Sequence, residues 1–136
     1  MTTQLVYSTG RVFSFVNDQT PLQFCTGMTA IGLEKDGEVI AGVVYEGFNG
    51  VNMWMHVGAL PGRRWCTRPA MAAWFGYPFL QCGVKRISGY VNASNLVARR
   101  FDEHVGFKQE AVLNGAAPDG GDVIIYAMRR EECKYV

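Results

Sequence analysis

Two dipeptides in the first half of the chain, Asp36-Gly37 and Asn49-Gly50, constrain the fold more than any other feature. Each lies between apolar runs, and both favour the positive φ angles of tight two-residue turns. They therefore predict three antiparallel strands, near residues 28–35, 38–47 and 51–59. The second of these is apolar on both faces, which places it in the centre of a sheet.

Helical patterns lie on either side of this meander. Gly10 to Asn17 has apolar residues at helical spacing and predicts a short helix. After the third strand, Thr67 can cap a helix that has Pro69 at its first position. Because Pro78 is poorly tolerated inside a helix, we expect this one to end near Tyr77. The side chains predicted to face the core are Met71, Trp74 and Phe75.

The second half predicts a strand over 85–91, then a helix over 92–104 with Ser94 or Asn92 as its cap. Gly106 is expected to end that helix. The apolar face of the helix is predicted to consist of Val97, Phe101 and Val105.

Two more strands are expected near 107–113 and 122–129. This order of elements predicts an α/β (α+β) chain with one mixed, mostly antiparallel sheet. The order is helix, meander, helix, strand, helix and two strands.

Length and composition limit the class of protein. The 136 residues suit a single domain over 1–136, and 49% apolar with 18% charged residues is a globular composition. A net charge of +1 argues against nucleic acid as a partner, and no stretch approaches the ~18 apolar residues of a membrane span. Four widely spaced cysteines without a CxxC pair predict no metal site and fit reduced thiols in the cytoplasm.

An arginine-rich loop precedes the helix that begins near Pro69. Free N–H groups and the positive end of a helix dipole can bind phosphates, and Arg63, Arg64 and Arg68 would add charge. The alternative is that these arginines are simply solvated.

A family resemblance rests on three segments. The firmest is Asn95-Leu96-Val97-Ala98-Arg99-Arg100-Phe101-Asp102-Glu103-His104-Val105-Gly106-Phe107. The hairpin from Asp36 to Gly42 and the last strand, Ile125-Tyr126-Ala127-Met128, agree with it. From Met28 to Arg130 the chain resembles the GCN5-related N-acetyltransferases, the GNAT superfamily.

This resemblance implies helices on both faces of the sheet and transfer of an acetyl group from acetyl-CoA, a co-substrate, to a primary amine. The pantetheine arm would lie against Met55 to Ala59, where the strand separates from its parallel neighbour. The family's pyrophosphate loop corresponds to Arg64 to Pro69, but Thr67 and Pro69 replace its glycine and Gly/Ala positions. The implied cofactor-binding residues are Val57, Ala59, Arg63, Arg64, Cys66, Thr67, Arg68, Asn95 and Arg99. The alternative for Asn95 is that it only caps the helix or faces water.

Transfer to an amine needs a base to remove a proton from the ammonium group. His56 lies near the end of the third strand, and its ordinary pKa suits neutral pH. Glu46 ends the neighbouring strand and could act directly, through water, or by orienting His56. The alternatives are a half-buried structural histidine and a solvated carboxylate.

Two further points of mechanism are open: which group protonates the departing thiolate, and whether a cysteine is acylated first. The family often has a tyrosine seven residues after the helix Asn, where it can protonate the leaving thiolate, whereas this chain has Asp102 there. Either the thiolate leaves with the help of solvent, or Tyr90 or Tyr126 substitutes. Cys66 lies where a helix N-terminus and arginines would lower its pKa, which would permit an acyl-cysteine route.

The acceptor, a small molecule or a protein, is not specified by the sequence. Segments 18–27 and 114–121 are expected to face it, and Asp18 and Asp119 hint at a cationic amine. A non-catalytic acyl-CoA-binding or interaction domain on the same fold is the alternative function. Exposed aromatic residues between Trp54 and Phe79 could form a homodimer face.

Overall fold

The computed structural model describes residues 3–19 and 28–136. Its elements are β1 (Thr3–Val6), α1 (Thr9–Gln19), β2 (Thr29–Lys35), β3 (Glu38–Glu46), β4 (Asn52–Ala59), α2 (Arg68–Gly76), η1 (Tyr77–Gln81), β5 (Arg86–Asn92), α3 (Leu96–Val105), β6 (Lys108–Leu113), β7 (Val123–Arg129) and η2 (Arg130–Glu132). Cys25 and most of the predicted acceptor segment 18–27 lie outside these residues.

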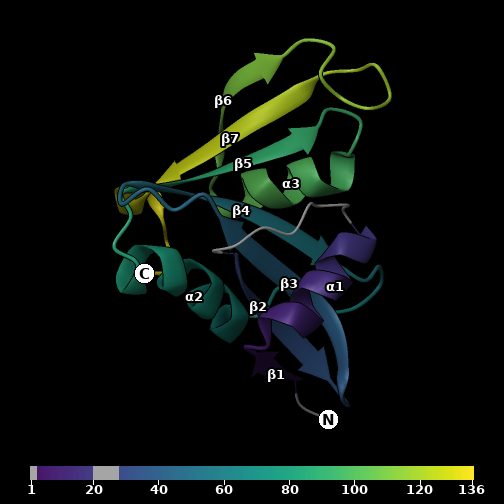
Figure 1. Cartoon of the computed structure of the whole chain (residues 1–136), viewed down its shortest axis with the longest axis vertical. Helices are drawn as coiled ribbons and strands as arrows, with labels where there is room; N and C mark the ends of the chain where they lie inside the picture. The colour runs from purple at the N-terminus through teal and green to yellow at the C-terminus, as the bar shows by residue number, and fades with distance from the viewer. Residues whose placement is uncertain (1–2, 20–27) are drawn as a thin grey trace.

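All seven strands form one sheet in the order β1-β2-β3-β4-β5-β7-β6, which runs from the bottom to the top of Figure 1. Five neighbouring pairs are antiparallel, and β4 and β5 are parallel. The predicted mixed, mostly antiparallel sheet is therefore confirmed, as are the three strands of the meander. The first strand, β1, was not predicted; it pairs with a strand far along the chain, β2, and its four residues carry little periodic signal.

One face of the sheet carries α1 on a stripe of glycines. Gly32, Gly42 and Gly58 pair across β2, β3 and β4, so their missing side chains point the same way. A Cβ on Gly42 would lie 2.7 Å from Cγ1 of Val12 in α1. The absence of side chains on this stripe is what allows the helix to lie close to the sheet.

The opposite face carries α2 and α3 over the larger hydrophobic core. Trp74 of α2 is fully buried; its Nε1 donates to the carbonyl of Ile31 at 3.0 Å, and the Tyr45 hydroxyl donates to the Trp74 carbonyl at 2.5 Å. Met71 and Phe75 are buried beside it, as predicted. Helices thus cover both faces of the sheet.

The chain does not leave helical geometry at Tyr77. Thr67 caps α2 through its side chain and Pro69 occupies the first turn, as predicted, but a π-helical turn, η1, follows directly. Pro78 lies at the start of this turn, where the wider hydrogen-bonding pattern accommodates its missing N–H. The α-helix therefore ends at Gly76 with Tyr77 as its C-cap, as predicted, and the π-helical turn after it was not predicted.

The predicted third helix forms, with two corrections. Asn95, rather than Ser94 or Asn92, is the cap, because its Oδ1 accepts from the Ala98 N–H at 3.2 Å. Val97 is 77% exposed and lies off the apolar face, whereas Val105 is fully buried. Gly106 ends the helix in the left-handed region, as predicted.

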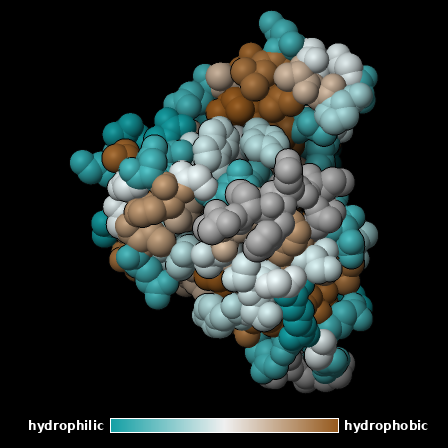
Figure 2. All heavy atoms as spheres, viewed as in Figure 1, coloured by the Kyte–Doolittle hydropathy of each residue, from teal (hydrophilic) through white to brown (hydrophobic). Residues whose placement is uncertain are grey.

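The last hairpin projects beyond the core. Every residue of β6 is exposed, and Val112 and Leu113 remain 40% and 46% exposed. Figure 2 shows apolar atoms gathered at this upper end of the molecule. The predicted aromatic dimer face is not tested, although Trp74, Phe75 and Phe79 are core residues.

Candidate active site

The parallel strands β4 and β5 separate part-way along their length. Their pairing covers only Asn52–Trp54 against Arg86–Ser88, and beyond it the two strands diverge, with α3 beside the gap (Figure 1). The gap is a cleft of about 450 Å³. Its strand residues include Met55, His56, Val57, Gly58, Ala59, Gly89, Tyr90, Val91 and Asn92, and its helix residues include Gln19, Asn95, Ala98, Phe101 and Asp102.

The cleft passes between the two faces of the sheet. His56 and Gly58 point to the face covered by α1, because they pair with Val44 and Gly42 on that face. Met55 and Val57 point to the face covered by α2 and α3. Side chains from both layers therefore meet where the strands separate.

His56 lies at the beginning of this gap. It is 5% exposed, and its Nε2 lies 3.5 Å from Oε2 of Glu46 on the neighbouring strand. Burial lowers the pKa of His56, and the nearby Glu46 carboxylate only partly opposes this. The imidazole is consequently neutral at neutral pH, and 3.5 Å leaves Nε2 without a close hydrogen bond among the described residues.

Tyr90 lies across the gap from His56. The two ring centroids are 5.1 Å apart in an edge-on arrangement, and Trp54 contacts the same tyrosine at 6.0 Å. Burial and the Glu46 carboxylate raise the pKa of Tyr90, so its hydroxyl stays protonated. Tyr126, the other candidate acid, does not line the cleft; its hydroxyl donates to Glu103 at 2.7 Å.

The helix side of the cleft differs from the sequence prediction. Asn95 lines it, but its side-chain oxygen is occupied by the cap, which leaves the amide NH₂ as the free donor. Arg99 is not a lining residue; it donates to the Ala93 carbonyl at 3.1 Å and to the Tyr126 hydroxyl at 3.4 Å. Asp102, which was not among the predicted binding residues, lines the cleft with its carboxyl partly buried.

The arginine loop lies beside the cleft and contributes Trp65 to its wall. Arg63 pairs with Glu38 at 3.2 Å, and Arg64 and Arg68 are exposed. At the start of α2, the Thr67 hydroxyl accepts from the Ala70 N–H and Pro69 has no N–H to offer. Fewer helix-terminal donors are thus available to a phosphate than at an ordinary N-terminus.

One electrostatic prediction for this loop is wrong. Burial raises the pKa of the Cys66 thiol, and the nearby Lys134 charge offsets this only in part. The exposed arginines and the helix end do not produce a reactive thiolate, so the acyl-cysteine route loses its physical basis.

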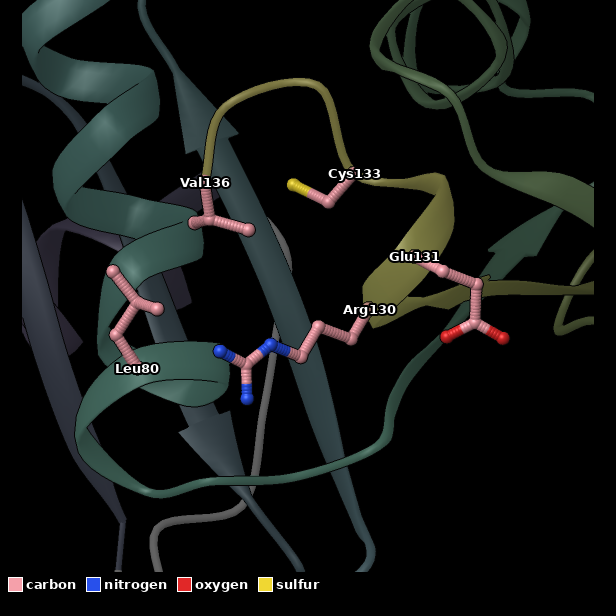
Figure 3. Close-up of a pocket in the computed structure, with 5 residues that line it drawn as sticks. All are labelled: Leu80, Arg130, Glu131, Cys133 and Val136. Atoms are coloured by element: carbon pink, nitrogen blue, oxygen red, sulfur yellow. The ribbon is translucent and has the colours of Figure 1, made fainter.

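A second hollow, of about 350 Å³, lies at the carboxyl end of the chain. It is lined by Leu80, Arg130, Glu131, Cys133 and Val136, and in Figure 3 the Glu131 carboxylate points away from the others. The Arg130 N–H donates to the carbonyl of Lys85, just before β5, so this hollow is remote from the open end of the cleft. We therefore take the cleft between β4 and β5 as the candidate active site.

The architecture was compared with solved structures. A chimera of the spermidine N-acetyltransferase SpeG from Vibrio cholerae with hSSAT matches with a TM-score of 0.77, 14% identity and 99% coverage of both chains. This chain has the GNAT fold. PseH, an N-acetyltransferase from Campylobacter jejuni in complex with acetyl coenzyme A, gives a TM-score of 0.61 at 14% identity, covering 78% of this chain and 70% of its own.

Proteins assigned as acetyltransferases are similar too. One from T. thermophilus gives a TM-score of 0.66 at 19% identity, over 79% of this chain. This chain spans only 62% and 63% of the length of that protein and of another so assigned. No family model matches the sequence, and no curated protein is similar to it. At identities this low, the structural similarity establishes the fold alone.

Within residues 3–19 and 28–136, no group of three or more His, Cys, Asp or Glu side chains is arranged to hold a metal ion. In the same part of the chain, no helix has both the length and the apolar character needed to cross a membrane.

Proposed function

We propose that the protein is an N-acetyltransferase that transfers an acetyl group from acetyl-CoA to a primary amine. The observation that carries this proposal is the neutral, buried His56 at the point where β4 and β5 separate. A neutral imidazole is the form of histidine that can accept a proton. It lies beside an open cleft, where the reacting groups could meet.

The co-substrate would lie on the α3 side of the cleft. The edge of β4 from Met55 to Ala59 is not paired with β5, so its backbone groups could bond to the amides of the pantetheine arm. The Asn95 NH₂ group could bond to the arm from the opposite wall. Arg64 and Arg68, exposed at the neighbouring loop, would contact the phosphates in place of the missing N–H donors.

The amine would approach from the α1 side, where His56 and Glu46 lie. His56 takes a proton from the ammonium group, and the Glu46 carboxylate stabilises the resulting imidazolium. The neutral amine then attacks the thioester carbonyl, and N–H groups on the unpaired edge of β4 stabilise the oxyanion. Similarity to spermidine N-acetyltransferases supports amines as acceptors. A cytosolic location suits this chemistry and the free thiols of Cys66, Cys82 and Cys133.

Calorimetric titration with acetyl-CoA and with free coenzyme A tests the donor without knowledge of the acceptor. We expect saturable binding that Arg64→Ala weakens and that His56→Ala leaves intact. Failure of the intact protein to bind acetyl-CoA would refute the proposal.

Catalysis is then tested with a panel of primary amines. His56→Ala should lower kcat about 10²- to 10⁴-fold, the usual contribution of a general base. Because burial lowers the pKa of His56, kcat/KM should fall only at a pH below the ordinary histidine value and be level just above it. A fall that begins above that value would contradict the assignment of His56 as base.

A non-catalytic acyl-CoA-binding domain is the second candidate. It is favoured by the start of α2, where the Thr67 cap and Pro69 remove anion-binding N–H groups. Binding of acetyl-CoA without turnover of any amine, unchanged by His56→Ala, would support this alternative.

A further inference from the structure

The carboxyl group of Asp102 has no role in the mechanism proposed above. It lines the cleft on α3, and no described residue forms a hydrogen bond or an ion pair with its side chain. Its immediate neighbour Glu103 is different, because that carboxylate accepts from the Tyr126 hydroxyl at 2.7 Å. A carboxyl group that is partly withdrawn from water and has no partner is costly to keep ionised. When it lines a cleft, such a group is a candidate for a functional residue.

The register of the sheet gives the position of Asp102 along the cleft. Tyr126 pairs with Gly89, so the contact of Glu103 with the Tyr126 hydroxyl places this turn of α3 at the level of Gly89. Gly89 is the first residue of β5 beyond the pairing with β4, and a Cβ on it would lie 3.5 Å from the carbonyl oxygen of Met55. Asp102 therefore lies at the start of the gap, on the wall opposite Met55.

Gly89 leaves room at this level. Its cross-strand partner Tyr126 points toward α3, so a side chain at position 89 would project into the same space. Because glycine has no side chain, the cleft stays open between β5 and Asp102. His56 follows Met55 directly, but its side chain points to the other face of the sheet. The His56 imidazole and the Asp102 carboxyl thus border the same part of the cleft, each from a different face of the sheet.

We propose that Asp102 is the general acid that protonates the sulfur of coenzyme A as the thioester breaks. The amine nitrogen forms a bond to the acetyl carbon, the carbon–sulfur bond breaks, and the proton of the Asp102 carboxyl passes to the sulfur. The nitrogen loses two protons in all: one goes to His56 and then to solvent, and the other restores the Asp102 carboxyl. The products are the amide and the free thiol.

The charges around Asp102 are consistent with a carboxyl that holds its proton. Burial and the adjacent Glu103 raise the pKa of Asp102 from 3.8 to about 7. Across the cleft, His56 is neutral and Tyr90 is protonated, so neither supplies a positive charge. Arg99, one turn earlier on α3, is directed to Ala93 and Tyr126 instead.

The inference rests on the proposed acetyl transfer, and Asp102→Asn tests it. We expect a kcat with acetyl-CoA lowered about 10²-fold, at the low end for general acids because a thiolate is a good leaving group. Acetyl-CoA affinity should be unchanged. S-phenyl thioacetate releases a weaker base that needs no acid, so the variant and the wild type should react with it at equal rates. Glu131→Gln, on the remote surface, is the matched control and should behave as the wild type.

A titration that needs no acceptor supports the kinetics. Carbon-13 NMR of labelled aspartate side chains should show one carboxyl that titrates near neutral pH and is missing from Asp102→Asn. The inference is overturned if every aspartate titrates as an exposed carboxyl, if the variant keeps the wild-type kcat, or if both thioesters lose rate equally. Failure of the wild type to bind acetyl-CoA would instead refute the proposed function, and this inference with it.

Discussion

Raising the pH should lower the free energy of unfolding of the wild type more than that of the Asp102→Asn variant. Folding raises the pKa of this carboxyl from 3.8 to about 7, so the native state binds its proton more tightly than the unfolded state does. The stabilisation by the bound proton is complete below about pH 4 and is lost as the pH rises through about 7. At 1.36 kcal/mol per pH unit, the full loss is of the order of 4 kcal/mol.

Asparagine has nearly the same shape and no titrating proton, so it escapes this loss. Urea denaturation of both proteins at about pH 4.5 and about pH 8 measures the effect as a difference in the free energy of unfolding. We expect the difference in the free energy of unfolding, variant minus wild type, to rise by several kcal/mol from about pH 4.5 to about pH 8. Glu131→Gln is the control, because a backbone hydrogen bond and, after it, Arg129 lower the pKa of Glu131, so any change should have the opposite sign. An equal difference at both pH values would refute the argument from burial.

Three further predictions concern the scaffold, and urea denaturation measures each. Gly42→Ala should destabilise the protein by about 1–3 kcal/mol, because the new Cβ would overlap Val12; an unchanged midpoint would mean that α1 can move away. Tyr45→Phe should cost about 1–3 kcal/mol, since the buried carbonyl of Trp74 loses its hydroxyl donor; a neutral result would show that water replaces it. Gly106→Ala should cost about 1–2 kcal/mol, because its φ of 115° disfavours a side chain; full stability would show that the turn can relax.

The parts of the fold that could be read from the sequence are those fixed by local chemistry. Asp36-Gly37 forms the predicted two-residue turn between β2 and β3, with both φ angles positive. The prediction for Asn49-Gly50 is wrong in detail: residues 47–51 connect β3 to β4, and Gly47 and Gly50 rather than Asn49 take the positive φ angles. The two strands are antiparallel neighbours all the same, so the meander and its alternation follow. The hypothesis that Glu46, at the end of the neighbouring strand, could orient His56 is consistent with the 3.5 Å between His56 Nε2 and Glu46 Oε2. By contrast, β1 depends on a partner strand far along the chain, and its four residues carry no signal of their own.

The walls of the cleft could not be predicted in the same way. They depend on where the pairing of β4 and β5 stops, which is set by packing on both faces of the sheet. The contact of Arg63 with Glu38 and the inward course of Arg99 are also tertiary. One signal was present in the sequence: Gly89 interrupts a strand pattern, and such a glycine often marks a close approach of backbone or ligand.

The opening through the sheet has a kinetic consequence. Gln19 borders the cleft from the α1 layer, and Phe101 borders it from the α3 layer. In the proposed reaction, the donor and the acceptor would each enter from its own side of the sheet and would bind together, so that neither has to leave before the other enters. Initial-rate plots at several fixed acceptor concentrations should then intersect, as they do for a ternary complex, rather than run parallel as they would for an acylated enzyme.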